Sequence, residues 1–569
     1  MAFTATAVWE VQTGGDDTNN GGGFDTGVSG FPTDGTVDTN TGDTASPVFS
    51  SASYNFVAGD VGASIYIKSG TDSIPGWYPI VSVASNKATL DAAIGAAAVR
   101  YHSGATVPTL VAPNTAIGLA TVGTPTSLTW GIDYSQQAAP EISFTDLVIG
   151  GTTTQFTSAA NPVGKNFVGN TISITAGTGF TVQRVAVVST SGTTATCDKS
   201  LGTGGSTGGT GGFGGCLASV GLAGSVLVNS NVISVKTGSY SITSATVNIA
   251  GGCLSGQARI VGYATVRGDN GTAPTLTASG ITTATIVNLT GNAGLTQNVA
   301  IDGATLTSIR GLQVGNGTAY LVWVKNCTNS GIYLSTRSVA YRCRASGCIT
   351  TFAAFECRGA DLFACEAYDN TIAGFGVNVG GNNLSNCLSY GNTGATTDGF
   401  SFSAGVALLN CVSYGNGRDG FRVSGNAGII IVNCIAEGNS AYGFNLSSAT
   451  TPVILTNCAT YNNTSGSASL PTTASPLIIP VAVAALSGSP FTNAAADDFS
   501  LNNTAGAGAS CRAAGFPGTF ASGSTTGYLD IGAVQHADPA ASVSASLGWA
   551  PVATIIHRAV ASGFTPGRG

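Results

Sequence analysis

Cysteine recurs at a nearly constant spacing through the second half of this chain. The recurring residues are Cys343, Cys365, Cys387, Cys411, Cys434 and Cys458. Successive members are separated by 22, 22, 24, 23 and 24 residues. A period in the low twenties is typical of a solenoid, in which each repeat forms one coil and contacts only its neighbours. The spacing therefore predicts a long, stiff, non-globular rod for this part of the chain.

Each recurring cysteine is followed, four and five residues later, by a pair of turn residues. The pairs are Gly347-Cys348, Asp369-Asn370, Gly391-Asn392, Gly415-Asn416, Gly438-Asn439 and Asn462-Asn463. Gly, Asp and Asn tolerate positive φ best, so we expect a left-handed residue at the first position of each pair. The second position is Asn in five of the six coils. Because an amide carries both a donor and an acceptor, stacked asparagines can hydrogen-bond from coil to coil.

Between these turns, Gly-Phe dipeptides open segments in which apolar residues alternate with small or polar ones. The dipeptides are Gly374-Phe375, Gly399-Phe400, Gly420-Phe421 and Gly443-Phe444. The alternation has a period of two, which predicts β-strands with their apolar side chains directed inward. A tyrosine stands just before the turn in most coils, and stacked aromatic rings add packing between neighbouring coils.

The repeated pattern "NC…YGN…GF" between Asn326 and Asn463 resembles the coils of right-handed parallel β-helix proteins of the pectate-lyase-like superfamily. The segment 232–244, "VISVKTGSYSITS", resembles the usual first coil of such helices. Two later segments, 497–503 and 527–536, resemble the sequence that closes them. The resemblance implies an all-β fold, a right-handed parallel β-helix.

The N-terminal part contains an internal duplication. Residues 49–95 align with residues 156–202 at a constant offset of 107. Alternating residues between turn signals predict a small β module in each copy, inserted near the N-terminus. The predicted organisation is a strand and loop that open the β-helix (1–47), two small β modules with a connector (48–202, with modules at 48–95 and 156–202), a flexible Gly-rich linker and cap (203–231), the β-helix with its closing segment (232–536) and a C-terminal tail (537–569).

The composition of the 569-residue chain limits the classes of partner. Only 8% of the residues are charged, and the net charge is −7. A nucleic-acid-binding protein needs a basic stripe, so we expect no nucleic-acid partner. No apolar stretch reaches the roughly 18 residues of a membrane span. The start, "MAFTATAVWEVQTGGDD", lacks the basic and apolar regions of a signal peptide, so we expect neither export nor a membrane span.

Thirteen cysteines could suggest disulfides, but the count is odd and six of them stand in one column. Like residues in one column are more simply small hydrophobic groups of the coil wall, so we expect free thiols. Folding in the cytosol, combined with a surface rich in Ser, Thr, Asn and Gly, is natural for a virion component that is released by lysis. Bacteriophage tailspikes and related virion proteins often have the β-helix fold, so the resemblance implies a virion location.

The regular coils contain one dense charged patch and none of the three histidines, His102, His536 and His557. The members of the patch are Arg337, Arg342, Arg344, Glu356, Arg358, Asp361, Glu366 and Asp369. Lyase sites combine carboxylates with an arginine or lysine base, so the patch is a candidate for binding or cleaving a glycan. The alternative is a solvated surface whose charges pair with one another. We predict no metal ion and no cofactor, and we interpret the "RGD" at 267–269 as a turn.

The residue after each recurring cysteine changes character along the rod. The column runs Arg344, Glu366, Leu388, Val412, Ile435 and Ala459. If the cysteines face inward, this column faces outward and becomes apolar toward the C-terminal coils. An apolar stripe on a rod is a contact surface, either for another copy of the chain or for the segment 470–569. The remaining alternative is that the column lies in the core.

Two functions fit these patterns. The favoured one is a non-catalytic bacteriophage virion protein: a stiff fibre, spike or decoration protein that contacts other virion proteins. It would form a homo-oligomer, with a trimer among the forms considered, and host-surface polysaccharide is its further candidate partner. The alternative is a tailspike polysaccharide depolymerase, either a lyase or a hydrolase.

Overall fold

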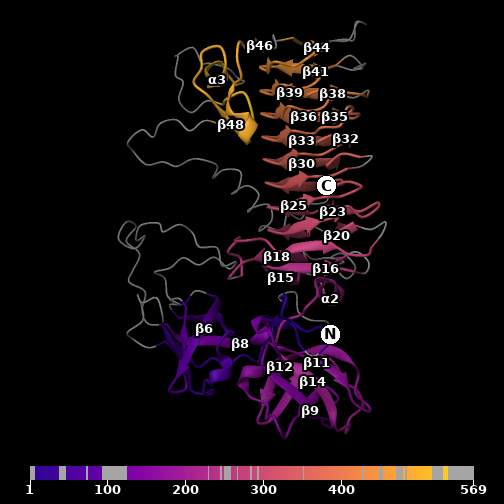
Figure 1. Ribbon diagram of the computed structural model, residues 1–569. Helices are drawn as coiled ribbons and strands as arrows, with labels where there is room; N and C mark the ends of the chain where they lie inside the picture. The colour runs from indigo at the N-terminus through magenta and orange to yellow at the C-terminus, as the bar shows by residue number, and fades with distance from the viewer. Residues whose placement is uncertain are drawn as a thin grey trace, which may run out of the picture.

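The computed structural model contains a rod of stacked β-coils with two small barrels near its N-terminal end (Figure 1). It describes residues 7–18, 20–37, 47–71, 73, 75–91, 125–227, 230–243, 247–248, 258–265, 267–281, 285–290, 294–349, 352–425, 428–446, 453–469, 479–480, 484–515 and 529–535. The three histidines and the predicted tail 537–569 lie outside these residues. The described helices are short: α2 (Val220–Val226), α3 (Gly508–Cys511), η1 (Ala58–Asp60), η2 (Tyr134–Gln136), η3 (Lys165–Phe167) and η4 (Ala494–Ala496).

Three sheets form the rod. The first sheet has 13 strands: β2 (Gly23–Asp25), β1 (Ala7–Val11), β15 (Val232–Lys236), β18 (Arg259–Tyr263), β21 (Leu295–Gln297), β24 (Thr318–Tyr320), β27 (Ser338–Tyr341), β30 (Ala360–Phe363), β33 (Asn382–Ser385), β36 (Val406–Leu409), β39 (Ile429–Val432), β42 (Val453–Thr456) and β45 (Ile479–Pro480). The second sheet has 11: β16 (Ser239–Ile242), β19 (Thr275–Ala278), β22 (Ala300–Asp302), β25 (Trp323–Lys325), β28 (Arg344–Ser346), β31 (Glu366–Tyr368), β34 (Leu388–Tyr390), β37 (Val412–Tyr414), β40 (Ile435–Glu437), β43 (Ala459–Tyr461) and β46 (Ala484–Ala485). The third sheet has 10: β17 (Val247–Asn248), β20 (Thr285–Thr290), β23 (Arg310–Gly315), β26 (Ile332–Leu334), β29 (Phe355–Arg358), β32 (Phe375–Val379), β35 (Phe400–Phe402), β38 (Phe421–Val423), β41 (Tyr442–Asn445) and β44 (Gly466–Ser469). Each coil contributes one strand to each sheet in turn, so the predicted all-β parallel β-helix is confirmed.

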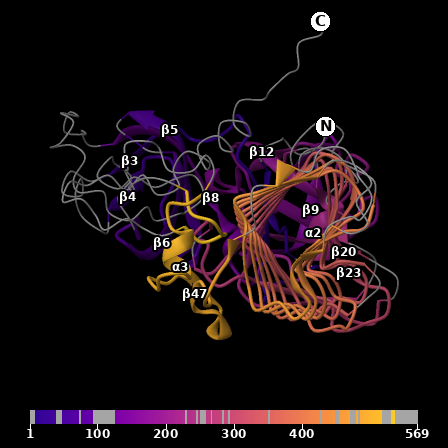
Figure 2. The same ribbon diagram turned by 90° about the horizontal axis from the view of Figure 1, so that it is seen from above.

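Inward side chains of the same kind stack from coil to coil. The rings of Phe355, Phe375, Phe400, Phe421 and Phe444 form one stack, with 4.8–4.9 Å between successive centroids. This distance matches the spacing of about 4.8 Å between hydrogen-bonded strands. The six recurring cysteines are buried and lie where the chain passes from the first sheet to the second. The core is therefore continuous along the rod, and in Figure 2 the coils superpose when the rod is seen along its axis.

The turns of the coils have the predicted left-handed residues. The first position of each turn pair has a φ between +51° and +65°, from Asn462 to Gly438. A second left-handed column, which the sequence patterns did not predict, stands directly before the cysteines. It consists of Arg342, Ala364, Asn386, Asn410, Asn433 and Asn457. Asn and Asp tolerate this conformation better than other residues that carry a Cβ atom, which explains the recurrent "NC".

The asparagines of the turn pairs form the predicted ladder. Each side-chain amide donates from its Nδ2 to the Oδ1 of the asparagine one coil further on. From Asn370 through Asn392, Asn416 and Asn439 to Asn463, the four distances are 2.8, 2.7, 3.0 and 2.8 Å. The first four of these side chains are buried, so the ladder satisfies polar groups that would otherwise be unpaired in the interior.

The duplicated segments form two closed six-stranded barrels with the same strand order. The first barrel runs β3 (Gly35–Val37), β4 (Val48–Ser51), β7 (Lys87–Leu90), β6 (Gly76–Ala84), β5 (Ser64–Thr71) and β8 (Thr126–Asp133). The second barrel runs β9 (Ile142–Ile149), β10 (Gln155–Thr157), β13 (Thr194–Cys197), β12 (Gln183–Ser191), β11 (Thr171–Ala176) and β14 (Gly209–Phe213). Each barrel thus includes a strand before and a strand after the module bounds that the sequence predicted.

The predicted flexible linker 203–231 instead contributes strand β14 to the second barrel and forms the helix α2. Its glycines serve close packing. A Cβ atom on Gly211 would lie 2.4 Å from the carbonyl oxygen of Ser173, and one on Gly209 would lie 2.5 Å from the Phe180 ring. Composition suggested flexibility because it cannot distinguish a glycine that permits motion from one that permits close approach.

The N-terminal strand and the first coil belong to one sheet. Strand β1 pairs in parallel with β15, so that Val8 lies opposite Val232. The same strand pairs antiparallel with β2, whose Phe24 packs against Phe31 and Tyr66. The chain therefore begins the rod, builds both barrels beside its end, and returns to continue the rod (Figure 1).

The C-terminal part of the chain packs on the outer face of the second sheet as a strap (residues 486–515 and 529–535). Its ordered pieces are the hairpin β47 (Phe491–Asn493) and β48 (Asp498–Leu501) and the short helix α3. Phe499 lies 4.9 Å from the ring of Tyr390 and 5.6 Å from that of Tyr414. The predicted apolar column faces outward, and the strap buries its members Val412, Ile435 and Ala459. Of the two covers considered, the chain's own C-terminal segment is the one observed (Figures 1 and 2).

Candidate functional site

The structure distributes the predicted charged patch over the three faces of the rod. Arg344 and Glu366 lie in the second sheet, Glu356 and Arg358 in the third, and Asp361 in the first. The patch is therefore several small groups around the circumference. Arg337, Arg342 and Asp369 occupy left-handed turn positions between the sheets, with φ of +64°, +52° and +53°.

Arg344 and Glu366 form an ion pair on neighbouring rungs of the second sheet. The Nε atom of Arg344 lies 3.0 Å from Oε2 of Glu366, and its Nη2 atom donates to Oε1 at 3.3 Å. The preceding rung carries Trp323, directly beside Arg344 in the β25–β28 pairing. Trp323 is 41% exposed, and its indole Nε1 donates to Ser346 at 3.1 Å. An exposed aromatic ring thus stands next to a planar, two-point ion pair.

A second ion pair extends this surface by one rung. Lys325 lies 3.2 Å from Asp302, and its Nζ atom lies 5.5 Å from the centroid of the Trp323 ring. We call the face formed by Asp302, Trp323, Lys325, Arg344 and Glu366 the mid-rod surface. Burial alone would raise the pKa of Asp302. Hydrogen bonds donated by the backbone of Ala304 and by the side chains of Asn326 and Lys325, together with the charge of Lys325, outweigh burial and lower this pKa. The mid-rod surface therefore presents fixed charges of both signs around one aromatic side chain.

The corner between the first and second sheets adds further aromatic groups. The rings of Tyr320 and Tyr341 stack with their centroids 5.5 Å apart. The guanidinium of Arg342 lies 5.4 Å from the Tyr341 centroid. A cation–π contact of this kind restricts the arginine side chain. The attraction between the guanidinium and the ring offsets the conformational entropy that is lost. The corner and the mid-rod surface adjoin, because Arg342 and Arg344 flank the same buried cysteine.

Glu356 lies in a separate cluster on the third sheet and is only 1% exposed. Ser330 donates to its Oε2 at 2.6 Å, and Arg358 donates from Nη2 to its Oε1 at 2.8 Å. The guanidiniums of Arg310 and Arg358 lie over the ring of Tyr333, at 4.3 and 5.3 Å from its centroid. The donors occupy both oxygens of this enclosed carboxylate, so Glu356 is poorly placed to take a proton from a substrate.

The two other carboxylates of the predicted patch have local partners or local roles. Asn383 donates to Asp361 at 2.7 Å across the first sheet. Asp369 replaces glycine at the left-handed turn position, which by itself accounts for the residue type.

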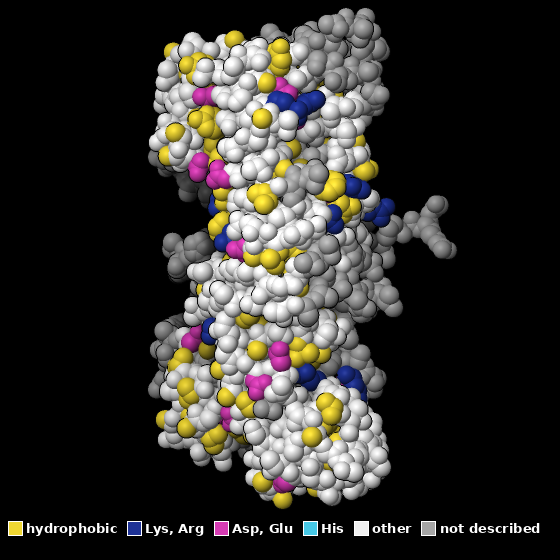
Figure 3. All heavy atoms as spheres, turned by 45° about the vertical axis from the view of Figure 1, so that its right-hand side comes forward, with side chains coloured by type: hydrophobic (Ala, Val, Ile, Leu, Met, Phe, Trp, Pro, Cys, Tyr) yellow, Lys and Arg dark blue, Asp and Glu magenta, His cyan; other side chains and the backbone are white. Residues whose placement is uncertain are grey.

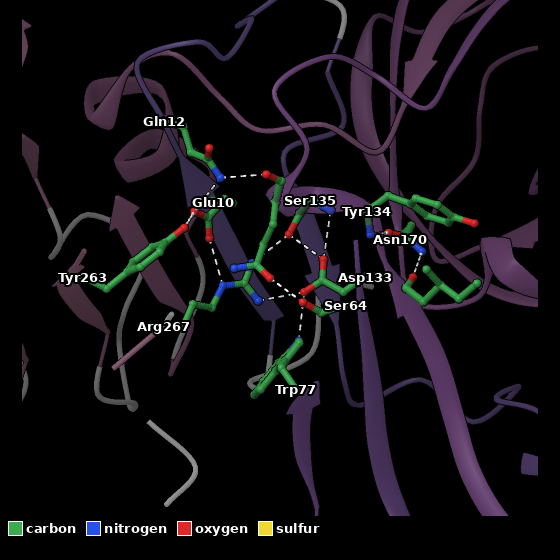
Figure 4. A network of polar contacts seen from close by, with 12 residues as sticks. Glu10, Gln12, Ser64, Trp77, Asp133, Tyr134, Ser135, Asn170, Tyr263 and Arg267 are labelled. Carbon is green, nitrogen blue, oxygen red and sulfur yellow. Dashed lines mark hydrogen bonds and ion pairs between the residues drawn. The ribbon is translucent and has the colours of Figure 1, made fainter. Parts of the chain in front are cut away.

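A buried polar network that the sequence patterns missed joins the first barrel to the rod (Figure 4). Arg267 lies 2.9 Å from Glu10 of β1 and 2.7 Å from Asp133 of β8. Both carboxylate side chains are fully buried. Burial lowers the pKa of Arg267, but Asp133 and Glu10 outweigh burial and raise it. The "RGD" is indeed a turn, because Asp269 accepts from the backbone of Ala264 and Gly271.

Two carboxyl groups meet at the junction between the barrels. Asp60 accepts from the hydroxyl groups of Tyr134 at 2.5 Å and Tyr54 at 3.0 Å. A Cβ atom on the adjacent Gly59 would lie 2.8 Å from Oε1 of Glu141, which places the second carboxyl group beside the first. Burial, and secondarily the charge of Asp60, raises the pKa of Glu141 to about 7.

The described residues show no further site of a common kind. They contain no group of three or more His, Cys, Asp and Glu side chains that could hold a metal ion. None of their helices is long and apolar enough to cross a membrane. The face drawn in Figure 3 is dominated by uncharged polar groups and backbone, with scattered charged side chains.

Comparisons with known proteins add the following. No protein-family model matches the chain, and no curated protein matches it either. Among solved structures, it is similar to pectate lyase Pel9A, with 15% identity over 57% of this chain and 92% of that one, and a TM-score of 0.38. It is also similar to ORF18 of Geobacillus virus E2, with 15% identity over 44% and 56% of the two chains and a TM-score of 0.37. A rhamnogalacturonan lyase matches with 14% identity, 44% and 70% coverage and a TM-score of 0.30. These likenesses carry no argument about what this chain does.

Proposed function

We propose that this chain is a stiff, non-catalytic structural rod of a bacteriophage virion, a fibre, spike or decoration protein, which binds polysaccharide of the host surface. In this proposal the chain self-associates, with a trimer among the possible forms, and contacts other virion proteins. Three parts of the proposal are supported by different observations. They are the structural role of the rod, its folding in a reducing compartment and its contact with polysaccharide.

The observation that carries the proposal is the unbroken stacking along the rod. The phenylalanine stack runs from Phe355 to Phe444 and the asparagine ladder from Asn370 to Asn463, so each of these coils is fixed to the next by packing and by hydrogen bonds in the interior. Stability in such a solenoid comes from contacts between neighbouring coils. The result is a stiff rod whose length is set by the number of coils. Such a rod suits a structural component of a virus particle.

The cysteines support folding in a reducing compartment. The twelve described cysteines are all free and buried. Disulfides form in oxidising compartments, and proteins that fold there seldom keep so many free thiols. A reduced interior beneath an outer surface that is low in charge fits a protein that folds in the host cytosol and acts outside it as part of a virion.

The mid-rod surface supports polysaccharide binding. Sugars bind through apolar ring faces that stack on aromatic side chains and through hydroxyl groups that hydrogen-bond to planar polar groups. Trp323 supplies the first kind of contact, and the pair of Arg344 and Glu366 supplies the second. The arginines beside Glu356 and Glu366 occupy those carboxylates, which favours binding over cleavage.

The test is to incubate the protein with the capsular and extracellular polysaccharides of its natural host and to measure both binding and turnover. We expect binding that falls about tenfold in Trp323→Ala, since a lost aromatic contact of about 1.4 kcal/mol corresponds to that factor. Phe352→Ala is the matched control, because Phe352 is also exposed but lies between β28 and β29, outside the strands of the second sheet. We expect no new reducing ends and no absorbance from unsaturated sugars.

Turnover would instead favour the depolymerase. Activity that disappears in Glu366→Gln but survives in Glu437→Gln would place the reaction at the mid-rod surface, because Glu437 accepts a hydrogen bond from Ser489 of the strap instead. Neither binding nor turnover would leave a purely architectural role on the particle and would contradict the polysaccharide part of the proposal.

A further inference from the structure

The three faces of the rod differ in what covers them. The outer face of the second sheet is buried by the strap over its C-terminal coils. The outer column of the third sheet is mainly polar, including Gln313, Glu356, Ser401, Arg422 and Asn445, and needs no cover. The outer face of the first sheet is the remaining one. The first barrel covers part of its first rungs, where Glu10, Ser234 and Tyr263 are buried, and no described segment buries the rungs from β21 to β42.

The outer face of the first sheet is rich in apolar side chains. Its two outward columns follow the strand pairing from β15 to β42. The apolar members are Val232, Val261, Leu295, Tyr320, Val339, Tyr341, Phe363, Ala407, Leu409, Ile430, Val432 and Ile454. Arg259 and Asp361 are the charged members of these columns among the described residues.

Exposure is greatest toward the C-terminal coils. Leu409 is 39% exposed and Ile430 is 42% exposed, and they stand on neighbouring rungs, in β36 and β39. Large apolar side chains that are exposed singly need no explanation, but a group of them on one face of a sheet marks a contact surface. Here Ala407, Leu409, Ile430, Val432 and Ile454 form such a group on the rungs β36, β39 and β42, beyond the polar pair Asn383 and Ser385. The inward neighbours Leu408 and Ile431 are buried, so the outward residues are not needed for the core.

We propose that the outer face of the first sheet is the surface on which a second copy of this chain packs, with the two rods parallel and in register. This inference extends the self-association included in the proposed function to a defined surface. It is tested in solution, without polysaccharide, so that its failure and the failure of the polysaccharide proposal can be told apart.

The repeat of the rod argues for a second copy as the partner. Its outward side chains recur once per rung, at about 4.8 Å. A partner can contact every rung in the same way only if its own side chains repeat at the same distance. Another copy of this rod has that repeat distance because it has the same fold. From β21 to β42, eight strands of about four residues give a plane of roughly 450 Å² before side-chain relief is counted. A stable interface buries roughly 800 Å² per partner, so the contact needs every one of these rungs.

Use of the whole length selects the parallel arrangement. A twofold axis along the rod places each rung opposite the same rung of the partner and sets one outward column against the other. Ile430 then meets Val432 of the partner subunit, and Ala407 meets the partner's Leu409. An antiparallel arrangement would either oppose the apolar coils to the barrel end or overlap only the last few rungs.

The exposed charges are compatible with the parallel arrangement. Arg342 stands at one edge of the face, at the turn into the second sheet, and Asp361 lies in the outward column at the other side of the sheet. Because the twofold axis sets each outward column against the other column of the partner, Arg342 of one copy approaches Asp361 of the partner subunit, which lies one rung away. Opposite charges at the rim of an apolar interface set its register more than its affinity.

The first test measures molar mass in solution by sedimentation or light scattering over a range of concentrations. We expect the parent to have the mass of two chains, because a twofold contact closes as a dimer, and Ile430→Lys to have the mass of one. Val182→Lys is the control, because Val182 is also exposed but belongs to the second barrel. A monomeric parent, or an oligomer that persists in Ile430→Lys, would overturn the inference.

The second test uses cysteine cross-linking, which does not depend on a disruptive variant. Because the described native cysteines are buried, Ile430→Cys and Val432→Cys each add an accessible thiol. We expect a covalent dimer, on mild oxidation, mainly when the two variants are mixed. Cross-linking of Ile430→Cys with itself would indicate the antiparallel arrangement and contradict the register. A monomer in which this thiol is shielded from a labelling reagent would assign the face to the chain's own residues 536–569 instead.

Discussion

At the scale of single residues, the asparagine ladder decides how firmly one coil is held to the next. Asn416 donates to Asn439 at 3.0 Å and to the carbonyl oxygen of Ser389 at 3.1 Å, and accepts from Asn392 at 2.7 Å. Asn416→Ala leaves these buried groups unpaired, so we expect a loss of about 1–3 kcal/mol in the free energy of unfolding, measured by denaturant titration.

The matched control for Asn416 is an asparagine on the outer surface of the same rod. Asn445 is unsuitable, because it donates to Asp419 at 2.9 Å. Asn383 is exposed, and its hydrogen bond to Asp361 lies at the solvent surface. Asn383→Ala should change stability by less than about 0.5 kcal/mol. Equal losses in the two variants would show that the ladder does not hold the coils together.

Arg267 differs from the ladder residues, because it is a buried charge whose partners belong to no repeat and are distant in the sequence. Arg267→Met removes the cation between the buried carboxylates of Glu10 and Asp133. Breaking a buried pair from one side typically costs about 3–5 kcal/mol, and we expect a loss of that size, measured by thermal or denaturant unfolding. Arg344→Met removes an exposed arginine and should cost at most about 1 kcal/mol.

The contrast between these residues shows what sequence patterns can reach. The ladder was predictable, because its members recur with the repeat and like residues meet. The second left-handed column was also visible, as the asparagine before most recurring cysteines, but its role depends on the backbone. Arg267 gave no signal, since its partners lie 257 and 134 residues away and belong to no repeat.

At the scale of elements, the junction between the barrels should respond to pH. The pKa of Glu141 is raised from 4.5 to about 7, so the folded state binds its proton more tightly than the unfolded state does. The protonated carboxyl group of Glu141 therefore stabilises the folded state at low pH, and this contribution to the free energy of unfolding is lost as the pH rises through about 7. We expect the parent to lose stability between about pH 4.5 and 7, while Glu141→Gln, which cannot ionise, loses less. Thermal unfolding at a series of pH values measures both, and parallel curves would contradict the assignment.

The strap offers a second prediction at this scale. Phe499 packs between the rings of Tyr390, Tyr414 and Phe491 and is almost fully buried. Phe499→Ala should cost about 3–5 kcal/mol of local stability, because a large buried ring is replaced by a cavity. We expect faster hydrogen exchange in residues 486–515 while the coils below the strap remain protected. Loss of protection throughout the rod would show that strap and coils unfold together.

The elements also show where sequence patterns stopped. The apolar column was predicted from the residue after each cysteine. The sequence left two alternatives for what packs on this column, another copy of the chain or the segment 470–569, and could not decide between them. The barrels were recognised only where a constant offset holds. Strand β3 begins at Gly35 and β9 at Ile142, still 107 residues apart, but the two strands are too short and too dissimilar to align. Strand β8 follows β7 after 35 residues and β14 follows β13 after 11, so the offset is lost there.

At the scale of the whole molecule, the rod is more predictable than its surroundings, because every coil repeats the same local rules. The candidate site was less predictable. The charged residues that the sequence singled out lie on neighbouring coils, but their position around the axis depends on which sheet each strand belongs to and which side of it faces outward. Trp323, the most exposed aromatic residue of the mid-rod surface, stands outside the cysteine period and was missed.

The redox state of the interior belongs to the whole molecule, since its cysteines run through rod, barrel and strap. Burial raises the pKa of the Cys216 and Cys511 thiols to about 12, and buried thiols in such surroundings are unreactive. In the folded protein purified without reductant, we therefore expect a thiol reagent to modify at most one cysteine, since twelve of the thirteen are buried. After denaturation without reductant, most of the thirteen should react. Six bonded pairs would show that the stacked cysteines oxidise in pairs, and would remove the support they give to folding in a reducing compartment.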